Sequence, residues 1–216
     1  MKKVTFIALA LISIIAFGQN DKKSINLLNE VSAKVSSYEN ISLDFTRILV
    51  NEEANVHEEI NGKINLEGDK YHLSLLGNEW IYDKKNTYVI SHGEDKEVNI
   101  ISGTLGEDES AFIPSKILTF YQTGYTYKWG ALKTIKGRKI QFISLIPISS
   151  EDENKEISLG IDVKTKNINK VVYKQKNGVV ITLKIRSFKA NTTLPDNEFV
   201  FDKKAYEEKG YYIEKL

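Results

Sequence analysis

The sequence of 216 residues contains no cysteine. Disulfide bonds and a cysteine nucleophile are therefore excluded, and an exported fold would have to stand without disulfide support. The chain also cannot carry a lipid attached to a cysteine of its own. We expect a soluble protein without a lipid anchor.

An excess of charge of one sign is also absent. The chain has 30 Lys and Arg against 29 Asp and Glu, which gives a formal net charge of +1 and a pI near 7.7. The charges are interspersed, and the aromatic residues do not gather on a basic stripe, as a nucleic-acid platform would require. We expect no nucleic-acid partner.

The sequence has few residues that could carry out catalysis. Of its three histidines, His57 begins His-Glu-Glu-Ile-Asn, which lacks the second histidine of a zinc-binding H-E-x-x-H motif. His72 falls on the polar side of a predicted strand, and His92 falls in a predicted turn. There is no G-x-S-x-G motif and no glycine-rich phosphate loop. We expect no catalytic residue, no metal and no cofactor.

Residues 1–18 differ from the rest of the chain. Two lysines precede a run of apolar residues from Val4 to Phe17, and small residues follow at the positions that a signal peptidase reads. This pattern is typical of a cleaved secretory signal peptide. A membrane-spanning helix needs about 20 apolar residues, and this run is shorter and ends at polar Gln19. We predict an exported protein whose single domain spans residues 19–216.

The apolar residues follow two different periods. Between Asp21 and Tyr38 they recur every three or four positions, which predicts an amphipathic helix. After Asn40 the period is two, which is typical of strands with one dry and one wet face. A short apolar helix is expected from Pro114 to Gln122, because proline suits a first helical turn. Strands are predicted at residues 41–50, 56–67, 71–75, 79–83, 86–91, 96–101, 125–129, 138–147, 156–164, 168–175, 179–188 and 198–202, and a Lys/Glu-rich tail follows them.

The predicted sheet is too wide for the predicted helices to cover. About 11 strands at about 4.8 Å spacing span on the order of 50 Å, whereas one helix covers about 10 Å. A twisted antiparallel sheet of this size splits into two layers, closes into a barrel or curls around something. We therefore predict an α+β, mainly antiparallel fold, in which an unclosed half-barrel with covering or lid helices leaves a hydrophobic cavity.

Apolar residues of the dry strand faces are the candidate walls of this cavity. Taken singly, each could equally belong to an ordinary core, but as a set around a thinly covered sheet they fit a hydrophobic ligand site. The candidate wall residues of this hydrophobic site are Phe45, Ile60, Ile64, Leu66, Tyr71, Leu73, Leu75, Trp80 and Tyr88. The candidate lid residues are Phe112, Ile117, Leu118, Phe120 and Tyr121.

Several short motifs follow one another along the chain. They are VSSYENISLDFTR (35–47), NGKINLEGDKYHLSL (61–75), EWIYDKKNTYVI (79–90), FIPSKIL (112–118), IDVKTKNINKVVYKQKNGVVITLKI (161–185) and NEFVF (197–201) with Gly210. In order and spacing they resemble the LolA family of periplasmic outer-membrane lipoprotein carriers. The resemblance implies a half-barrel, lidded by helices, that binds lipoprotein acyl chains without a catalytic step.

The resemblance also implies partners. Acylated lipoproteins would be the cargo, an inner-membrane ABC lipoprotein-release complex the donor, and an outer-membrane receptor or membrane acceptor the destination of a monomeric carrier. The family's Arg-Pro, whose arginine helps to hold the lid closed, is replaced here by Gly68-Asp69, and Lys70 or Arg47 could substitute for it. An envelope lipid-binding or sensing protein on the same fold stays open as an alternative. An enzyme acting on envelope glycolipid is disfavoured by the missing catalytic groups.

Overall fold

The computed structural model of the chain describes residues 22–94, 96–103 and 116–216. The signal peptide expected at residues 1–18 and the candidate lid residue Phe112 lie outside the described residues. Within those three ranges, no helix is both long and apolar enough to cross a membrane.

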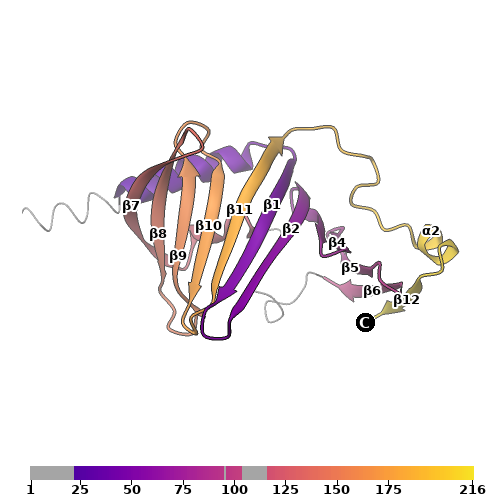
Figure 1. Cartoon of the computed structure of the whole chain (residues 1–216). Coiled ribbons are helices and arrows are strands. Elements are labelled where there is room, and N and C mark those ends of the chain that lie inside the picture. The colour runs from indigo at the N-terminus through magenta and orange to yellow at the C-terminus, as the bar shows by residue number, and fades with distance from the viewer. Residues whose placement is uncertain (1–21, 95, 104–115) are drawn as a thin grey trace, which may run out of the picture.

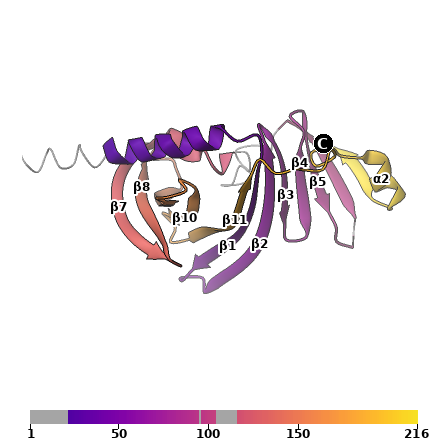
Figure 2. The ribbon, with the colours of Figure 1, turned by 90° about the horizontal axis from the view of Figure 1, so that it is seen from above.

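One curved sheet of 12 strands forms the body of the protein, in the order β12-β6-β5-β4-β3-β2-β1-β11-β10-β9-β8-β7. The strands are β1 (Ile41–Asn51), β2 (Val56–Glu67), β3 (Lys70–Leu75), β4 (Asn78–Tyr82), β5 (Asn86–Ser91), β6 (Glu97–Ser102), β7 (Tyr125–Ile135), β8 (Arg138–Pro147), β9 (Asn154–Asp162), β10 (Ile168–Gln175), β11 (Val180–Ala190) and β12 (Tyr212–Lys215). Neighbouring strands are antiparallel except β12, which pairs in parallel with β6. The sheet curls without closing, so the predicted α+β half-barrel is confirmed (Figures 1 and 2).

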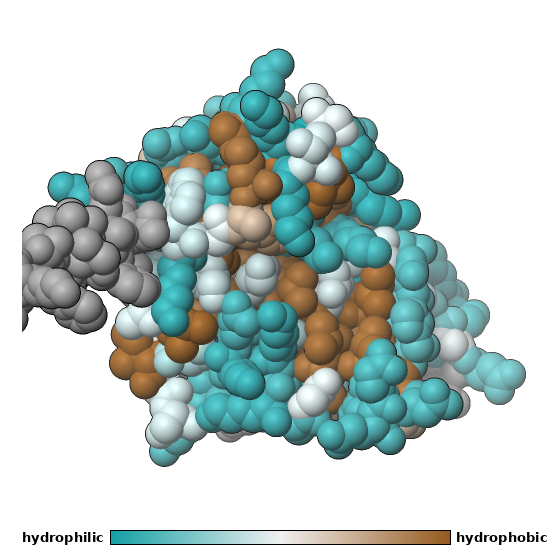
Figure 3. Space-filling view, turned by 60° about the vertical axis from the view of Figure 1, so that its left-hand side comes forward, coloured by the Kyte–Doolittle hydropathy of each residue, from teal (hydrophilic) through white to brown (hydrophobic). Residues whose placement is uncertain are grey.

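The N-terminal helix (residues 22–36) spans the open side of the arc formed by β7 to β11, β1 and β2 (Figure 2). Its apolar stripe faces the sheet, because Leu27, Leu28 and Val31 are 7%, 4% and 0% exposed. The short helix expected up to Gln122 appears, in the part that the structure describes, as a turn followed by the 3-10 helix η2 (Phe120–Gln122). Seen from the β7 side, hydrophobic residues are visible between hydrophilic ones (Figure 3).

Buried apolar side chains form two clusters. The main cluster lies on the concave face and joins residues of β1, β2, β3 and β8 to β11 to the N-terminal helix. A second, smaller cluster is built around Ile81, Ile90 and Val98. Because Ile81 follows Trp80, which packs against the main cluster, and successive strand residues point to opposite faces, the second cluster lies on the outer face.

The strand predicted at residues 198–202 is wrong. Residues 196–199 form a turn, and the helix α2 (Lys203–Glu208) begins directly after Asp202. The Asp202 carboxylate accepts a hydrogen bond from the Ala205 amide at 3.0 Å, which caps the helix. Lysine–glutamate pairs at i,i+4 spacing add support on the exposed side of α2. The expected Lys/Glu-rich tail therefore holds both α2 and the additional strand β12.

The strand predicted at residues 125–129 continues to Ile135. The pairing of β7 with β8 shifts register between Trp129 and Leu132, and Gly130 lies in this irregularity. A Cβ at residue 130 would lie 2.8 Å from the Phe142 carbonyl oxygen, so the bulge needs a glycine. The bulge interrupts the two-residue period, and the sequence pattern therefore hides the second half of this strand.

Candidate functional site

The concave face brings most of the candidate wall residues together. Phe45, Ile64, Leu66, Tyr71 and Leu73 are all at most 7% exposed and belong to the main cluster. Leu75 and Trp80 pack against this cluster and stay partly exposed. Three neighbouring strands, β1, β2 and β3, supply six of these seven side chains, and β4 supplies Trp80. The concave face of these strands is therefore one continuous apolar wall.

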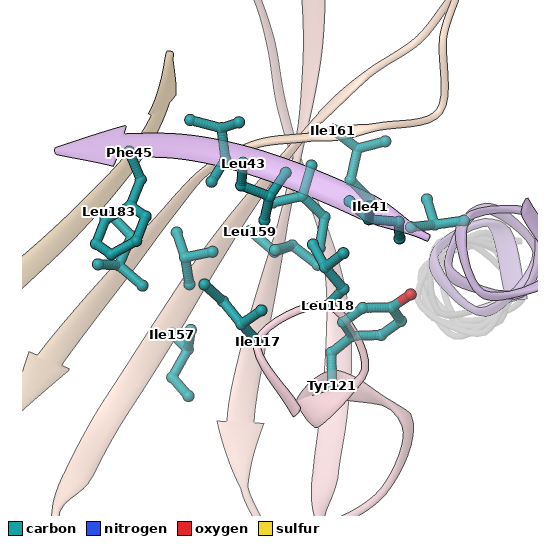
Figure 4. Packing of buried hydrophobic residues seen from close by; sticks show 14 of the residues in the cluster. Ile41, Leu43, Phe45, Ile117, Leu118, Tyr121, Ile157, Leu159, Ile161 and Leu183 are labelled. Atoms are coloured by element: carbon teal, nitrogen blue, oxygen red, sulfur yellow. The ribbon is translucent and has the colours of Figure 1, made fainter. Parts of the chain in front are cut away.

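The candidate lid residues that the structure describes fill the space in front of this wall. Ile117, Leu118 and Tyr121 are 5%, 2% and 0% exposed within the main cluster. Figure 4 shows Ile117 and Leu118 beside strand residues such as Leu43 and Leu159, and the Tyr121 hydroxyl on the side of the N-terminal helix. The segment 116–122 thus acts as a plug that covers the concave face with side chains of the chain itself.

Aromatic contacts hold the end of the plug. The Phe120 ring lies 5.8 Å from that of Tyr173 and 6.3 Å from that of Tyr125. The Tyr127 hydroxyl donates a 2.8 Å hydrogen bond to the Tyr121 carbonyl. Such edge and tilted ring contacts contribute about 0.5–1.5 kcal/mol each beyond their buried area. The plug is held mainly by apolar and aromatic packing.

Few polar groups lie at the concave surface. The buried Tyr121 hydroxyl has no hydrogen-bond partner. Burial, and to a smaller degree the neighbouring Tyr127, raises the pKa of Tyr121, so the hydroxyl stays neutral at every physiological pH. In the described part of the chain, no group of three or more His, Cys, Asp or Glu side chains could hold a metal ion. The surface can therefore bind an apolar molecule but offers it little polar recognition.

A pocket of about 320 Å³ lies where the N-terminal helix, the plug and β7 meet. This volume is at the lower end of the range for small-molecule sites. Ile25 lines this pocket and is 43% exposed. The lining residues are Ile25, Leu28, Asn29, Ser32, Tyr121, Gln122 and Tyr127. The helix near Ser24 to Tyr38 was expected to be part of the lid, but none of its residues was named in the predicted site, although Ile25 and Leu28 belong to the helical stripe seen in the sequence.

Three polar contacts tie the N-terminal helix to the rest of the protein. Glu30 pairs with Lys166 at 2.6 Å, and Lys34 donates to the Thr165 carbonyl at 2.5 Å. Both partners belong to the turn between β9 and β10. Gln122 donates to the Ser32 hydroxyl, which joins the helix to the plug. These three contacts are the polar latch of the helix.

Lys70 and Arg47 were the candidate replacements for the arginine that holds the family's lid closed. In the contacts that the structure describes, neither of them holds the lid. Lys70 pairs with Glu67 at 2.8 Å and lies over the Phe199 ring. Arg47 approaches Glu58 at 4.0 Å, within the β1–β2 hairpin. The polar latch described above uses different residues, namely Thr165 and Lys166 on the turn that follows β9 and Gln122 of the plug.

Two candidate wall residues lie apart from the others. Tyr88 points to the outer face, where it packs against the second cluster and stacks on Phe201 at 4.6 Å. Ile60 is half-exposed, because β2 extends beyond the point where its pairing with β3 ends, at Gly62 opposite Leu75. The structure therefore separates these two residues from the apolar wall.

Comparisons with known proteins identify relatives of the fold. No protein-family model matches the sequence, and no curated protein does. Among solved structures, an uncharacterized conserved protein from Thermus thermophilus matches with a TM-score of 0.56 at 11% identity, over 90% of this chain and 98% of that chain. A LolA superfamily protein from Nitrosomonas europaea matches with a TM-score of 0.40 at 10% identity, over 76% of this chain and 91% of that chain.

A third match is the complex of Pseudomonas aeruginosa MucA and MucB, with a TM-score of 0.50 at 11% identity, over 83% of this chain and 61% of that chain. At such low identities the likeness concerns the fold alone. The chain therefore shares the overall fold of the Thermus thermophilus protein and of the MucA–MucB complex, an open, curved antiparallel sheet.

Proposed function

We propose that this protein is a periplasmic carrier that binds the acyl chains of lipoproteins on its concave face. The observation that carries the proposal is the plug, because an apolar wall is covered by a short segment of the chain rather than by a second layer of sheet. An acyl chain that displaces Ile117, Leu118 and Tyr121 would meet a surface that is already apolar. The carrier has no catalytic step in this account.

The free energies of exchanging the plug for an acyl chain on the concave face favour reversible binding. Burying one CH₂ group contributes about 0.8 kcal/mol, so an acyl chain of about 15 methylenes gains on the order of 12 kcal/mol. Exposing Ile117 and Leu118 costs about 1.5–3 kcal/mol for each side chain, which offsets part of this gain. A ligand that must displace the plug binds more weakly than one entering an empty cavity, and a carrier that has to release its cargo needs this property.

We propose the following route for the cargo. The protein would take acylated lipoproteins from an inner-membrane ABC release complex and pass them, as a monomer, to an outer-membrane receptor or membrane acceptor. The resemblance of the sequence motifs to lipoprotein carriers supports this route. The alternative is an envelope lipid-binding or sensing protein on the same fold, whose ligand is not a lipoprotein.

A displacement experiment tests the proposal. The purified protein is loaded with an environment-sensitive apolar dye and titrated with a synthetic lipopeptide or with the same peptide lacking its acyl chains. We expect the lipopeptide to displace the dye and the bare peptide to leave it in place. If a free phospholipid displaces the dye and the lipopeptide does not, the alternative holds. Absence of displacement by either acylated ligand would rule out the binding function.

A further inference from the structure

A histidine lies between two carboxylates on the outer face of the sheet. His72 Nδ1 lies 3.0 Å from Glu198 Oε1, and His72 Nε2 lies 3.3 Å from Glu79 Oε2. The side chains are largely enclosed, with 20% of His72, 13% of Glu198 and 29% of Glu79 exposed. Glu79 is on β4, next to β3, whereas Glu198 is 126 residues from His72 in the sequence. The contact therefore joins the sheet to residues 198–215, which we call the C-terminal segment.

The cluster extends to a second point of the same segment. The other Glu79 oxygen lies 3.3 Å from His92 Nε2, and His92 Nδ1 lies 2.6 Å from the Tyr211 hydroxyl. Asn65 of β2 also donates its side-chain amide to Glu198. Glu79 therefore connects two histidines, and each of them contacts the C-terminal segment, at Glu198 and at Tyr211.

The C-terminal segment covers an apolar part of the outer face. Its Phe201 stacks on Tyr88, and the second cluster beneath it contains Ile90 and Val98, both 0% exposed. Its last strand, β12, adds to β6 and occupies the edge of the sheet. Release of the segment would expose both apolar side chains and the strand edge, which are features that attract other chains.

The protonation state of His72 decides how many of its contacts are hydrogen bonds. An imidazolium donates from both ring nitrogens, whereas a neutral imidazole donates from one and presents a lone pair at the other. Only protonated His72 can therefore donate to Glu79 and Glu198 at once. In the neutral form, one of the two carboxylates faces a lone pair.

The surroundings of His72 favour the protonated form. Burial alone would lower the pKa of His72, but its hydrogen bonds and its proximity to the charges of Glu79 and Glu198 outweigh burial and raise it. The hydrogen bond from His72 is the largest cause of the lowered pKa of Glu79. Three other titratable groups lie around the cluster without a described contact to His72. Lys70 lies over Phe199, Lys96 donates to the Lys209 carbonyl, and Tyr206 lies near Glu79.

We infer that His72, with Glu79 and Glu198, is a pH-sensitive clasp that holds the C-terminal segment on the outer face when protonated and loosens it when neutral. Because the group has a raised pKa in the folded state, its contribution is complete below the ordinary histidine value of about 6.5 and is lost as the pH rises through the folded value. The clasp lies on the face opposite the apolar wall and does not depend on the proposed function.

Amide hydrogen exchange of residues 198–215 tests the clasp. We expect protection of these amides, corrected for the intrinsic rate at each pH, to be constant below about pH 6. It should then fall as the pH rises, by tenfold for each unit by which contact with the C-terminal segment, and not with Glu79, raises the pKa of His72. The variant His72→Gln should lose this pH dependence. His57→Gln should keep it, because His57 is an exposed residue of β2 outside the cluster.

Two further measurements keep the test decisive. Protection of the β8 and β9 amides reports whether each variant is folded. Glu198→Gln, which removes a charge and keeps the shape of the side chain, should also flatten the pH profile. This second variant keeps the test decisive if His72→Gln fails to fold. A wild-type profile without a pH-dependent step would overturn the inference, and so would an unchanged step in both folded variants.

Discussion

The Phe45 ring lies directly over Gly62. The two residues are paired between β1 and β2, and a Cβ at residue 62 would lie 2.4 Å from Phe45 Cζ and 3.0 Å from Leu75 Cδ1. The glycine therefore gives the aromatic ring the space to lie flat across the concave face. This packing makes a smooth part of the apolar wall from residues of three neighbouring strands.

Replacing Gly62 by alanine should destabilise the protein. The added methyl group must push aside a buried ring that is 1% exposed, and such overpacking costs about 1–3 kcal/mol. Urea unfolding at pH 7 measures the change. Gly93→Ala is the matched control, because a Cβ there meets no atom within 4 Å, and its effect should stay within about 0.5 kcal/mol. Equal losses in both variants would contradict the packing described.

The pair of Glu30 and Lys166 should affect ligand binding as well as stability. Reversal of one charge, in Glu30→Lys, replaces an attraction at 2.6 Å by a repulsion and weakens the hold on the N-terminal helix. A half-exposed pair of this kind contributes about 0.5–1 kcal/mol. If opening of the helix precedes binding, the affinity for an apolar dye should rise about two- to fivefold.

The double variant Glu30→Lys/Lys166→Glu is the control for this prediction. It restores an ion pair with the charges exchanged, so the dye affinity should return to the wild-type value. A higher affinity that persists in the double variant would show that the charge at one position, and not the contact, is responsible.

Neighbouring residues on β3 test which face binds the ligand. Leu75 packs at the edge of the main cluster, and Ser74 points to the opposite face. Leu75→Glu should lower the dye affinity about tenfold or more, because a charge would be buried under the bound ligand. Ser74→Glu should leave the affinity unchanged. Fluorescence titration of both variants checks this, and similar losses would refute the assignment of the binding face.

Glu156 should make stability depend on pH in the acidic range. The hydrogen bond from Ser144, at 2.6 Å, and next the contact with Lys174, at 2.9 Å, lower the pKa of this carboxyl. A carboxyl group whose pKa is lower in the folded than in the unfolded protein stabilises the fold above its ordinary pKa, which is about 4.3 for glutamate. This stabilisation is lost as the pH falls through the pKa of the folded state.

Glu156→Gln should therefore destabilise the protein at pH 7 by about 0.2–1 kcal/mol and have little effect at pH 3. Urea titrations at the two pH values measure this difference. Glu151→Gln, in the exposed turn between β8 and β9, is the control for removal of a surface carboxylate, and its effect on stability at pH 7 should stay within about 0.5 kcal/mol. If the cost of Glu156→Gln is the same at both pH values, the carboxylate contributes nothing through its charge.

The antiparallel strands were predictable because each has one dry and one wet face over most of its length. The expected ranges for β5, β8 and β10 coincide with the observed ones. The half-barrel was also predictable, because the strands are too many for the helices to cover. The period-two pattern does not say which face of β5 is covered by the core, and for this reason Tyr88 was expected on the wall although it packs under the C-terminal segment.

The C-terminal region could be predicted only in part. Phe199, Val200 and Phe201 form a short β-prone apolar run that favours a strand. Asp202 and the Lys/Glu spacing that follows it are signals of a helix start, and they were present in the sequence. The parallel pairing of β12 with β6 joins residues more than 100 positions apart and has no local signal. The contact of His72 with Glu198 depends on that placement and could not be predicted from either neighbourhood alone.

Locking the plug to the N-terminal helix tests the central claim most directly. The chain has no cysteine, so Ser32→Cys/Gln122→Cys introduces the only two thiols, at side chains that are in contact. A short bismaleimide then joins them, and binding of the lipopeptide is measured by calorimetry before and after the reaction. We predict that the uncross-linked variant binds and that the cross-linked protein, still folded by circular dichroism, does not. Unchanged binding by the cross-linked protein would contradict the claim that the acyl chain displaces the plug.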